Sequence, residues 1–144
     1  MARVSRFEID LSLAVVLCDR AIATAADDGA LVSVAVVDAG GHLIAFQRMD
    51  GAEIAGPVLA RDKAYTAVAH RCATHELTAL VSPGADLAGM NSADSGRYIA
   101  FAGGVPLWDG DRVVGGIGVS GGSADQDRRS AESALTRFVA EQGV

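Results

Sequence analysis

Two tight turns between short apolar segments constrain the fold of this chain more than any other feature of its sequence. The turn sequence DAGG at 38–41 joins apolar segments at 31–37 and 42–49. The turn sequence DGD at 109–111 precedes a third apolar segment at 112–120. Turn residues placed between apolar runs of strand length are typical of β-hairpins. The sequence therefore predicts two antiparallel hairpins.

The segments outside the hairpins have helical signals. Ser5 with Glu8, and Ser123 with Gln126, have the spacing of a capping box at a helix start. Pro57 opens a helical segment that continues to about 71, and Thr74 begins a shorter one. Short apolar segments at 97–101 and 105–108 bring the number of expected strands to five. We therefore predict one α+β domain over 1–144, with a five-stranded, mainly antiparallel sheet flanked by helices.

The two strands of the first hairpin differ in their patterns. The segment 31–37 is apolar on both parities, which predicts a strand covered on both faces. The segment 42–49 is mixed, and strict alternation divides its side chains between two faces. We expect His42, Ile44, Phe46 and Arg48 on one face, and Leu43, Ala45, Gln47 and Met49 on the other.

Charge and hydropathy exclude two classes of partner. The net charge of −6 and the absence of any run of basic residues argue against nucleic-acid binding. The longest apolar stretches have seven or eight residues, whereas a membrane span needs about 20. Glu8 and Asp10 interrupt any hydrophobic region of an export signal, so the chain is expected in the cytoplasm. Cys18 and Cys72 lack a CxxC spacing and are interpreted as structural thiols.

The glycine-rich segment at 116–122 matches two catalytic patterns. Gly116–Gly121 fits GxGxxG, but no room remains after it for the second parallel strand of a dinucleotide site. Gly118–Gly122 fits the GxSxG of serine hydrolases, but all three histidines precede Ser120, whereas the catalytic histidine should follow the serine. Close backbone packing remains as one explanation of these glycines. The other is that backbone N–H groups at Gly103, Gly104, Gly116 and Ser120 contact a bound anion.

A lone lysine is the first candidate for a functional side chain. Lys63 lies among small residues on the central helical segment, which is not a position that serves solubility. One interpretation is structural, with Lys63 paired to Asp62, Asp50 or Asp38. The other is functional, with Lys63 and Arg48 together holding a ligand carboxylate.

Histidines supply the other candidates. His70 and His75 flank Cys72, and a break in the helix near Thr74 would bring them together as metal ligands. His70 lies among small apolar residues, where an imidazole can titrate near neutral pH, ligate iron or transfer a proton. The alternative places at least one of these histidines in a surface or capping role.

Five segments, in order, carry a resemblance to a known family. They are 36–43 (VVDAGGHL), 46–52 (FQRMDGA), 63–67 (KAYTA), 103–107 (GGVPL) and 114–122 (VGGIGVSGG). Together they resemble the GlcG/HbpS-like family, which is similar to the C-terminal domain of PduO-type proteins, over roughly residues 8–140. The resemblance implies a profilin-like fold, homo-oligomers from dimers to octamers, and haem binding in some members. His70 departs from the family, in which this position is more often aromatic.

Two functions follow as alternatives. In the first, the protein binds a small anionic molecule such as haem or a related tetrapyrrole. His42, His70, His75 or Met49 would then be the axial ligand, and Arg48 or Lys63 would contact the propionates. In the second, it is a cofactor-independent isomerase, hydratase or lyase acting on a small organic acid. His70 would be its acid/base, and Lys63 with Arg48 would hold the carboxylate. A third reading is a protein with a purely structural or regulatory role.

Overall fold

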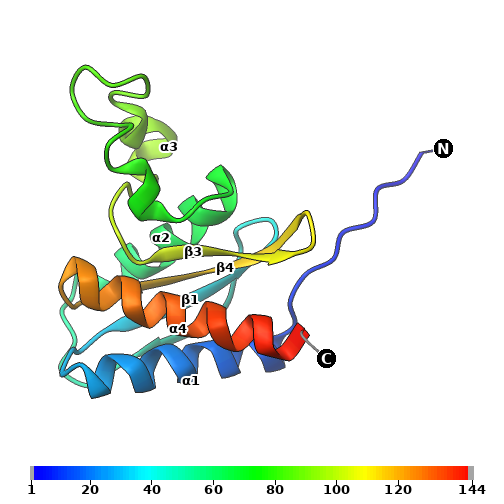
Figure 1. The fold of residues 1–144 in the computed structure, drawn as a ribbon, viewed down its shortest axis with the longest axis vertical. Coiled ribbons are helices and arrows are strands. Elements are labelled where there is room, and N and C mark those ends of the chain that lie inside the picture. The colour runs from blue at the N-terminus through cyan, green and yellow to red at the C-terminus, as the bar shows by residue number, and fades with distance from the viewer. Residues whose placement is uncertain (1, 143–144) are drawn as a thin grey trace.

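The computed structural model describes residues 2–142 as one α+β arrangement (Figure 1). A long helix begins and ends the chain, and two β-hairpins with a helical region between them lie in the middle. The elements are α1 (Leu11–Asp27), β1 (Ser33–Asp38), β2 (Leu43–Arg48), α2 (Gly56–His70), η1 (Thr74–Leu77), η2 (Met90–Ser92), α3 (Ala93–Gly96), β3 (Gly104–Asp109), β4 (Arg112–Ser120) and α4 (Ala124–Gln142). No helix among these residues is long and apolar enough to cross a membrane.

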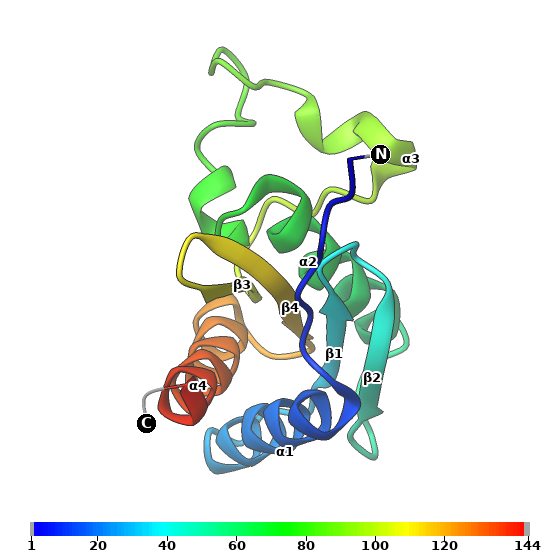
Figure 2. The ribbon, with the colours of Figure 1, turned by 90° about the vertical axis from the view of Figure 1, so that its right-hand side faces the viewer.

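The four strands form one antiparallel sheet in the order β2-β1-β4-β3. Helices α1 and α4 lie side by side on one face of it, and α2 lies on the other (Figures 1 and 2). β1 and β4 are therefore covered on both sides, as the apolar segment 31–37 indicates. The main core lies between the sheet and the α1–α4 layer.

The expected fifth strand at 97–101 does not form. Threonine hydroxyls occupy the backbone groups that a neighbouring strand would have used. Thr66 Oγ1 accepts from the N–H of Ile99 at 2.9 Å, and Thr74 Oγ1 donates to the carbonyl of Phe101 at 2.6 Å. Thr78 Oγ1 donates to the carbonyl of Ala100 at 2.7 Å. The segment is thus anchored to α2 and η1 by side chains, a pattern that apolar periodicity does not reveal.

The expected division of β2 into two faces is wrong at its first residues. The register shifts between Val36 and Val37, so that Val37 pairs with Leu43 and no β1 residue pairs with Ile44. This bulge places Leu43 on the same face as Phe46, because two residues of β2 oppose one of β1. Leu43 and Phe46 both lie on the α2 side of the edge strand, where they are 48% and 39% exposed.

One of the two predicted capping boxes is present. Ser123 N–H donates to Gln126 Oε1 and Gln126 N–H donates to Ser123 Oγ, which begins α4 as expected. The prediction at Ser5 is wrong, because α1 begins at Leu11 with Asp10 as its N-cap. Asp10 Oδ1 accepts from the Leu13 N–H at 2.8 Å, so it satisfies a free donor of the first turn.

Glycines allow α2 to lie directly against the sheet. A Cβ on Gly118 would stand 1.9 Å from the carbonyl oxygen of Ala60, and one on Gly104 would stand 2.4 Å from that of Lys63. A Cβ on Gly116 would be 2.8 Å from the carbonyl oxygen of Ala64. The glycines of β3 and β4 therefore serve close packing of helix and strand backbones.

Candidate functional site

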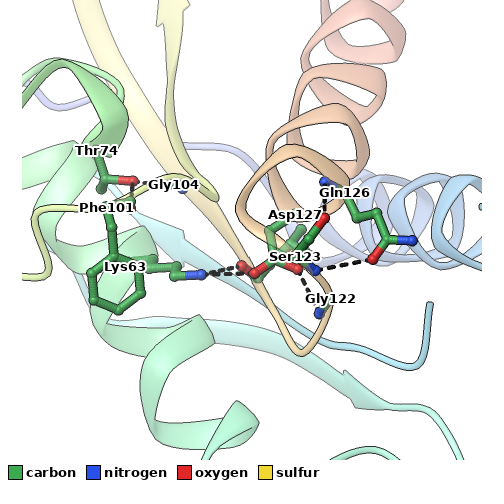
Figure 3. Close-up of polar contacts among 9 residues, drawn as sticks. Lys63, Thr74, Phe101, Gly104, Gly122, Ser123, Gln126 and Asp127 are labelled. Carbon is green, nitrogen blue, oxygen red and sulfur yellow. Dashed lines mark hydrogen bonds and ion pairs between the residues drawn. The ribbon is translucent and has the colours of Figure 1, made fainter. Parts of the chain in front are cut away.

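Lys63 belongs to α2, and its buried side chain extends toward the start of α4 (Figure 3). Its side chain is only 1% exposed, and its Nζ donates to Asp127 Oδ2 at 3.1 Å and to the carbonyl of Val119 at 2.9 Å. The Phe101 ring lies 5.0 Å from Nζ, a distance suited to a cation–π contact. The other carboxylate oxygen, Asp127 Oδ1, accepts from the Gly122 N–H at 2.9 Å.

Burial dominates the electrostatics of this ion pair. It lowers the pKa of Lys63 and raises the pKa of Asp127, and their mutual attraction offsets each shift only in part. Removing two charges from water is costly, and the hydrogen bonds from Gly122 and to Val119 reduce that cost. The pair fixes the start of α4 against α2 and the end of β4.

The sequence suggested other partners for Lys63. It pairs with Asp127 instead of Asp62, Asp50 or Asp38, because its side chain crosses the end of β4 to reach the α4 turn. The fold does not bring Arg48 close to Lys63. Arg48 ends β2, pairs in register with Ser33 and is exposed. Gly103 borders Lys63, since a Cβ there would stand 2.8 Å from Nζ. Ser120 ends β4 and is buried beside β1.

The three histidines occupy different environments. His42 follows the turn of the first hairpin, and its ring is 83% exposed, with Nδ1 3.3 Å from Asp38 Oδ1. His70 ends α2 and contacts Tyr98 edge-on, with ring centroids 4.5 Å apart. His70 Nε2 and His75 Nδ1 are buried without a hydrogen-bond partner within residues 2–142. No cluster of three or more histidine, cysteine or carboxylate side chains suited to a metal is found in that range.

A groove lies between the edge strand β2 and the start of α2. Its volume is about 430 Å³, and its walls are mainly apolar, formed by Leu43, Phe46, Pro57 and Val58. Arg61, Asp62 and Arg97 supply its polar side. Arg97 donates to Asp62 at 3.1 Å and stacks on the Tyr65 ring at 3.8 Å, so its position is fixed, whereas Arg61 forms no ion pair within residues 2–142.

Sequence reasoning missed both Asp127 and the arginines of this groove. Asp127 lies 64 residues from Lys63 along the chain, so no local spacing connects them. A usable signal was the capping box at Ser123 and Gln126, which places Asp127 in the first turn of α4. Arg97 lacked any such signal, since its partner Asp62 lies 35 residues earlier.

Comparisons with known proteins agree with this fold. Residues 9–136 match the family described as "Haem degrading protein HbpS-like". An uncharacterized 15.0 kDa protein of the dhaT-dhaS intergenic region of Citrobacter freundii is 44% identical over 107 residues, which are 74% of this chain and 75% of that protein.

Two solved structures are similar over nearly the whole chain. The Klebsiella pneumoniae protein ORFY superposes with a TM-score of 0.93 at 34% identity, covering 97% of each chain. A PduOC:heme complex superposes with a TM-score of 0.86 at 38% identity, covering 90% of this chain and 94% of that one. The match over residues 9–136 and these likenesses show that the chain belongs to the HbpS-like family, as the five sequence segments indicate.

Proposed function

We propose that this protein binds haem or a closely related tetrapyrrole. The observation that carries the proposal is its likeness to the PduOC:heme complex, which extends over most of both chains. The HbpS-like family description points the same way. A bound haem would supply an iron centre whose chemistry depends on its axial ligand and surroundings.

The groove beside β2 suits the body of such a ligand. Its volume of about 430 Å³ lies within the usual range for small-molecule sites, and its walls are largely apolar. Phe46 offers an aromatic face, and Leu43 and Val58 are exposed aliphatic side chains, 48% and 65% accessible. Arg61, which forms no ion pair within residues 2–142, offers a guanidinium for a propionate.

Among the histidines, we choose His42 as the residue that would hold the haem iron. Its side chain is 83% exposed, whereas His70 and His75 are partly buried. It precedes Leu43, which lines the groove, but His42 is not itself among the lining residues. Histidines that bind metals usually direct their second ring nitrogen to a carboxylate or carbonyl, and Asp38 lies 3.3 Å from His42 Nδ1. Met49 is a weaker candidate, because its Sδ already accepts from the Val32 N–H.

The small-acid enzyme has less support. Lys63 is buried and paired, and Arg48 is at the exposed end of β2, so the two do not form a carboxylate clamp in this chain. His70 as acid/base and the homo-oligomer stay predictions. A mass measurement of the purified protein in solution tests the latter.

Haem titration followed by absorption spectroscopy tests the proposal. We expect a Soret shift that saturates at one haem per subunit in the wild type, is lost in His42→Ala, and is retained in the matched control His75→Ala. A featureless, non-saturating response of the wild type would overturn haem binding. Saturation that survives His42→Ala but not His70→Ala would overturn the choice of ligand.

A further inference from the structure

A second cavity lies at the opposite end of α2 from the groove, and several of the side chains that line it are basic. It has a volume of about 570 Å³ and lies between the N-terminal segment, the two hairpin turns and the C-terminal half of α2. Figure 2 shows the N-terminal segment crossing in front of α2 and β1 there. Arg6, Arg71 and Arg112 line the cavity together with a single carboxylate, that of Asp111.

These three guanidinium groups are exposed and have no ion-pair partner within residues 2–142. Four other arginines each have a carboxylate at 2.6 to 3.1 Å, namely Arg97, Arg128, Arg129 and Arg137. The chain has 18 acidic residues against 12 basic ones, so carboxylates are not scarce. Arg6, Arg71 and Arg112 come from the N-terminal segment, the end of α2 and the start of β4, and they line one cavity with a single carboxylate. They therefore form a local excess of positive charge on an acidic protein.

The backbone at Arg71 adds an independent observation. Arg71 is the C-cap of α2 and has φ 54° and ψ 39°, in the left-handed region. Glycine is the usual residue at such a helix end, since a side chain there is strained. Arg71 therefore lines the cavity from a position at which a glycine would have been the more stable choice.

The remaining walls are partly apolar. Phe7, Tyr65, Val68 and Val113 line the same cavity, and the Arg112 guanidinium lies 5.1 Å from the Phe7 ring. The cavity thus offers several fork-shaped donors around a compact apolar surface. Guanidinium groups suit carboxylates and phosphates because they can donate two parallel hydrogen bonds.

We propose that this cavity binds a small polyanion, an organic acid with two or more carboxylates, held by Arg6, Arg71 and Arg112. The inference does not rest on haem binding, because it uses neither the groove nor His42. The sequence suggested that Lys63 and Arg48 bind an anion; this proposal assigns that role to the three arginines instead. The acidic groups are those of a free small acid, because the groove that we propose for haem lies at the other end of α2.

Calorimetric titration with citrate, succinate and acetate at constant ionic strength tests the proposal. We expect saturable citrate binding by the wild type, weaker succinate binding and none with acetate. Arg71→Gly and Arg112→Gln should each weaken citrate binding about tenfold or more. Arg20→Gln, which removes an exposed arginine of α1 outside the cavity, should leave it unchanged.

Arg71→Gly separates loss of binding from loss of folding. Glycine relieves the left-handed strain, so this variant should melt at a higher temperature while it binds citrate less tightly. Equal citrate affinity in the wild type, Arg71→Gly and Arg112→Gln overturns the proposal, as does the absence of saturable binding by the wild type. Citrate and haem should bind together, because the two proposed sites lie at opposite ends of α2; displacement of haem by citrate would overturn a separate acid site.

Discussion

Cations occupy two opposite environments in this protein. Lys63 is 1% exposed and paired with Asp127. Arg6, Arg71 and Arg112 are exposed, line one cavity and have no ion-pair partner among the described residues 2–142. A buried charge must be paired, because leaving it alone in the interior costs several kcal/mol, on the order of 3–5. An exposed guanidinium has no such requirement and stays available to a ligand. Burial and pairing therefore distinguish a cation with a structural role from one that is a candidate for ligand binding.

The largest effect is expected from breaking the buried pair. Lys63→Met leaves the Asp127 carboxylate buried without its cation, so the free energy of unfolding should fall by about 3–5 kcal/mol. Urea unfolding measures this loss. The double variant Lys63→Met/Asp127→Leu should recover much of it, because no unpaired charge remains. A double variant that is less stable than both single variants would contradict the structural role.

A buried thiol provides a second test, at alkaline pH. Burial raises the pKa of the Cys18 thiol from 9.0 to about 12. The folded state then keeps a proton that the unfolded state loses, so this contribution is complete below pH 9 and is lost as the pH rises toward 12. At pH 10 the loss should be about 1.4 kcal/mol.

The control for this prediction is Cys18→Ala. Urea midpoints of both proteins measured from pH 7.5 upward should diverge above pH 9, with the wild type falling more steeply. Parallel curves for the two proteins would show that Cys18 ionisation does not contribute.

A smaller, stabilising effect is expected at the cavity. Arg71→Gly removes a left-handed side chain and should raise stability by about 1 kcal/mol, or about 2–4 °C in melting temperature. Arg71→Ala is the matched control, since it removes the guanidinium but keeps the strain. Equal melting temperatures of the two variants would show that the backbone at Arg71 is unstrained.

The smallest effect is expected for a paired cation on the surface. Arg128 donates to Glu132 at 2.8 Å, with side chains 47% and 44% exposed. Solvent screens such pairs, so Arg128→Gln should not change the urea midpoint measurably. A loss comparable to that of Lys63→Met would mean that exposure does not distinguish the two pairs.

Local signals predicted the hairpins, α2 and the start of α4, because turns and caps are encoded within a few residues. Local signals did not predict the bulge at Ile44, because it depends on the register between β2 and β1. The segment 97–101 has strand-like apolarity, but threonines of α2 and η1 bind its backbone groups, and sequence does not show which side chains will reach them.

The candidate site was harder to predict than the fold. Lys63 stood out as a lone lysine, but its role depends on Asp127, which is distant in sequence. The sequence suggested that the backbone at Gly104 and Gly116 contacts a ligand. Glycine also permits close packing of two backbones, and only the proximity of α2 in the structure distinguishes the two uses. The arginine cavity joins the N-terminal segment, α2 and two turns, so no single segment reveals it.

Thermal unfolding with and without citrate tests the central distinction most directly. The wild type, Lys63→Met, Arg71→Gly and Arg20→Gln are melted under both conditions at equal ionic strength. We expect citrate to raise the melting temperature of the wild type, Arg20→Gln and the destabilised Lys63→Met, because a ligand stabilises the state that binds it. It should raise that of Arg71→Gly by less than that of the wild type, because this variant binds citrate less tightly. Citrate stabilisation that is undiminished in Arg71→Gly but disappears in Lys63→Met would contradict the account.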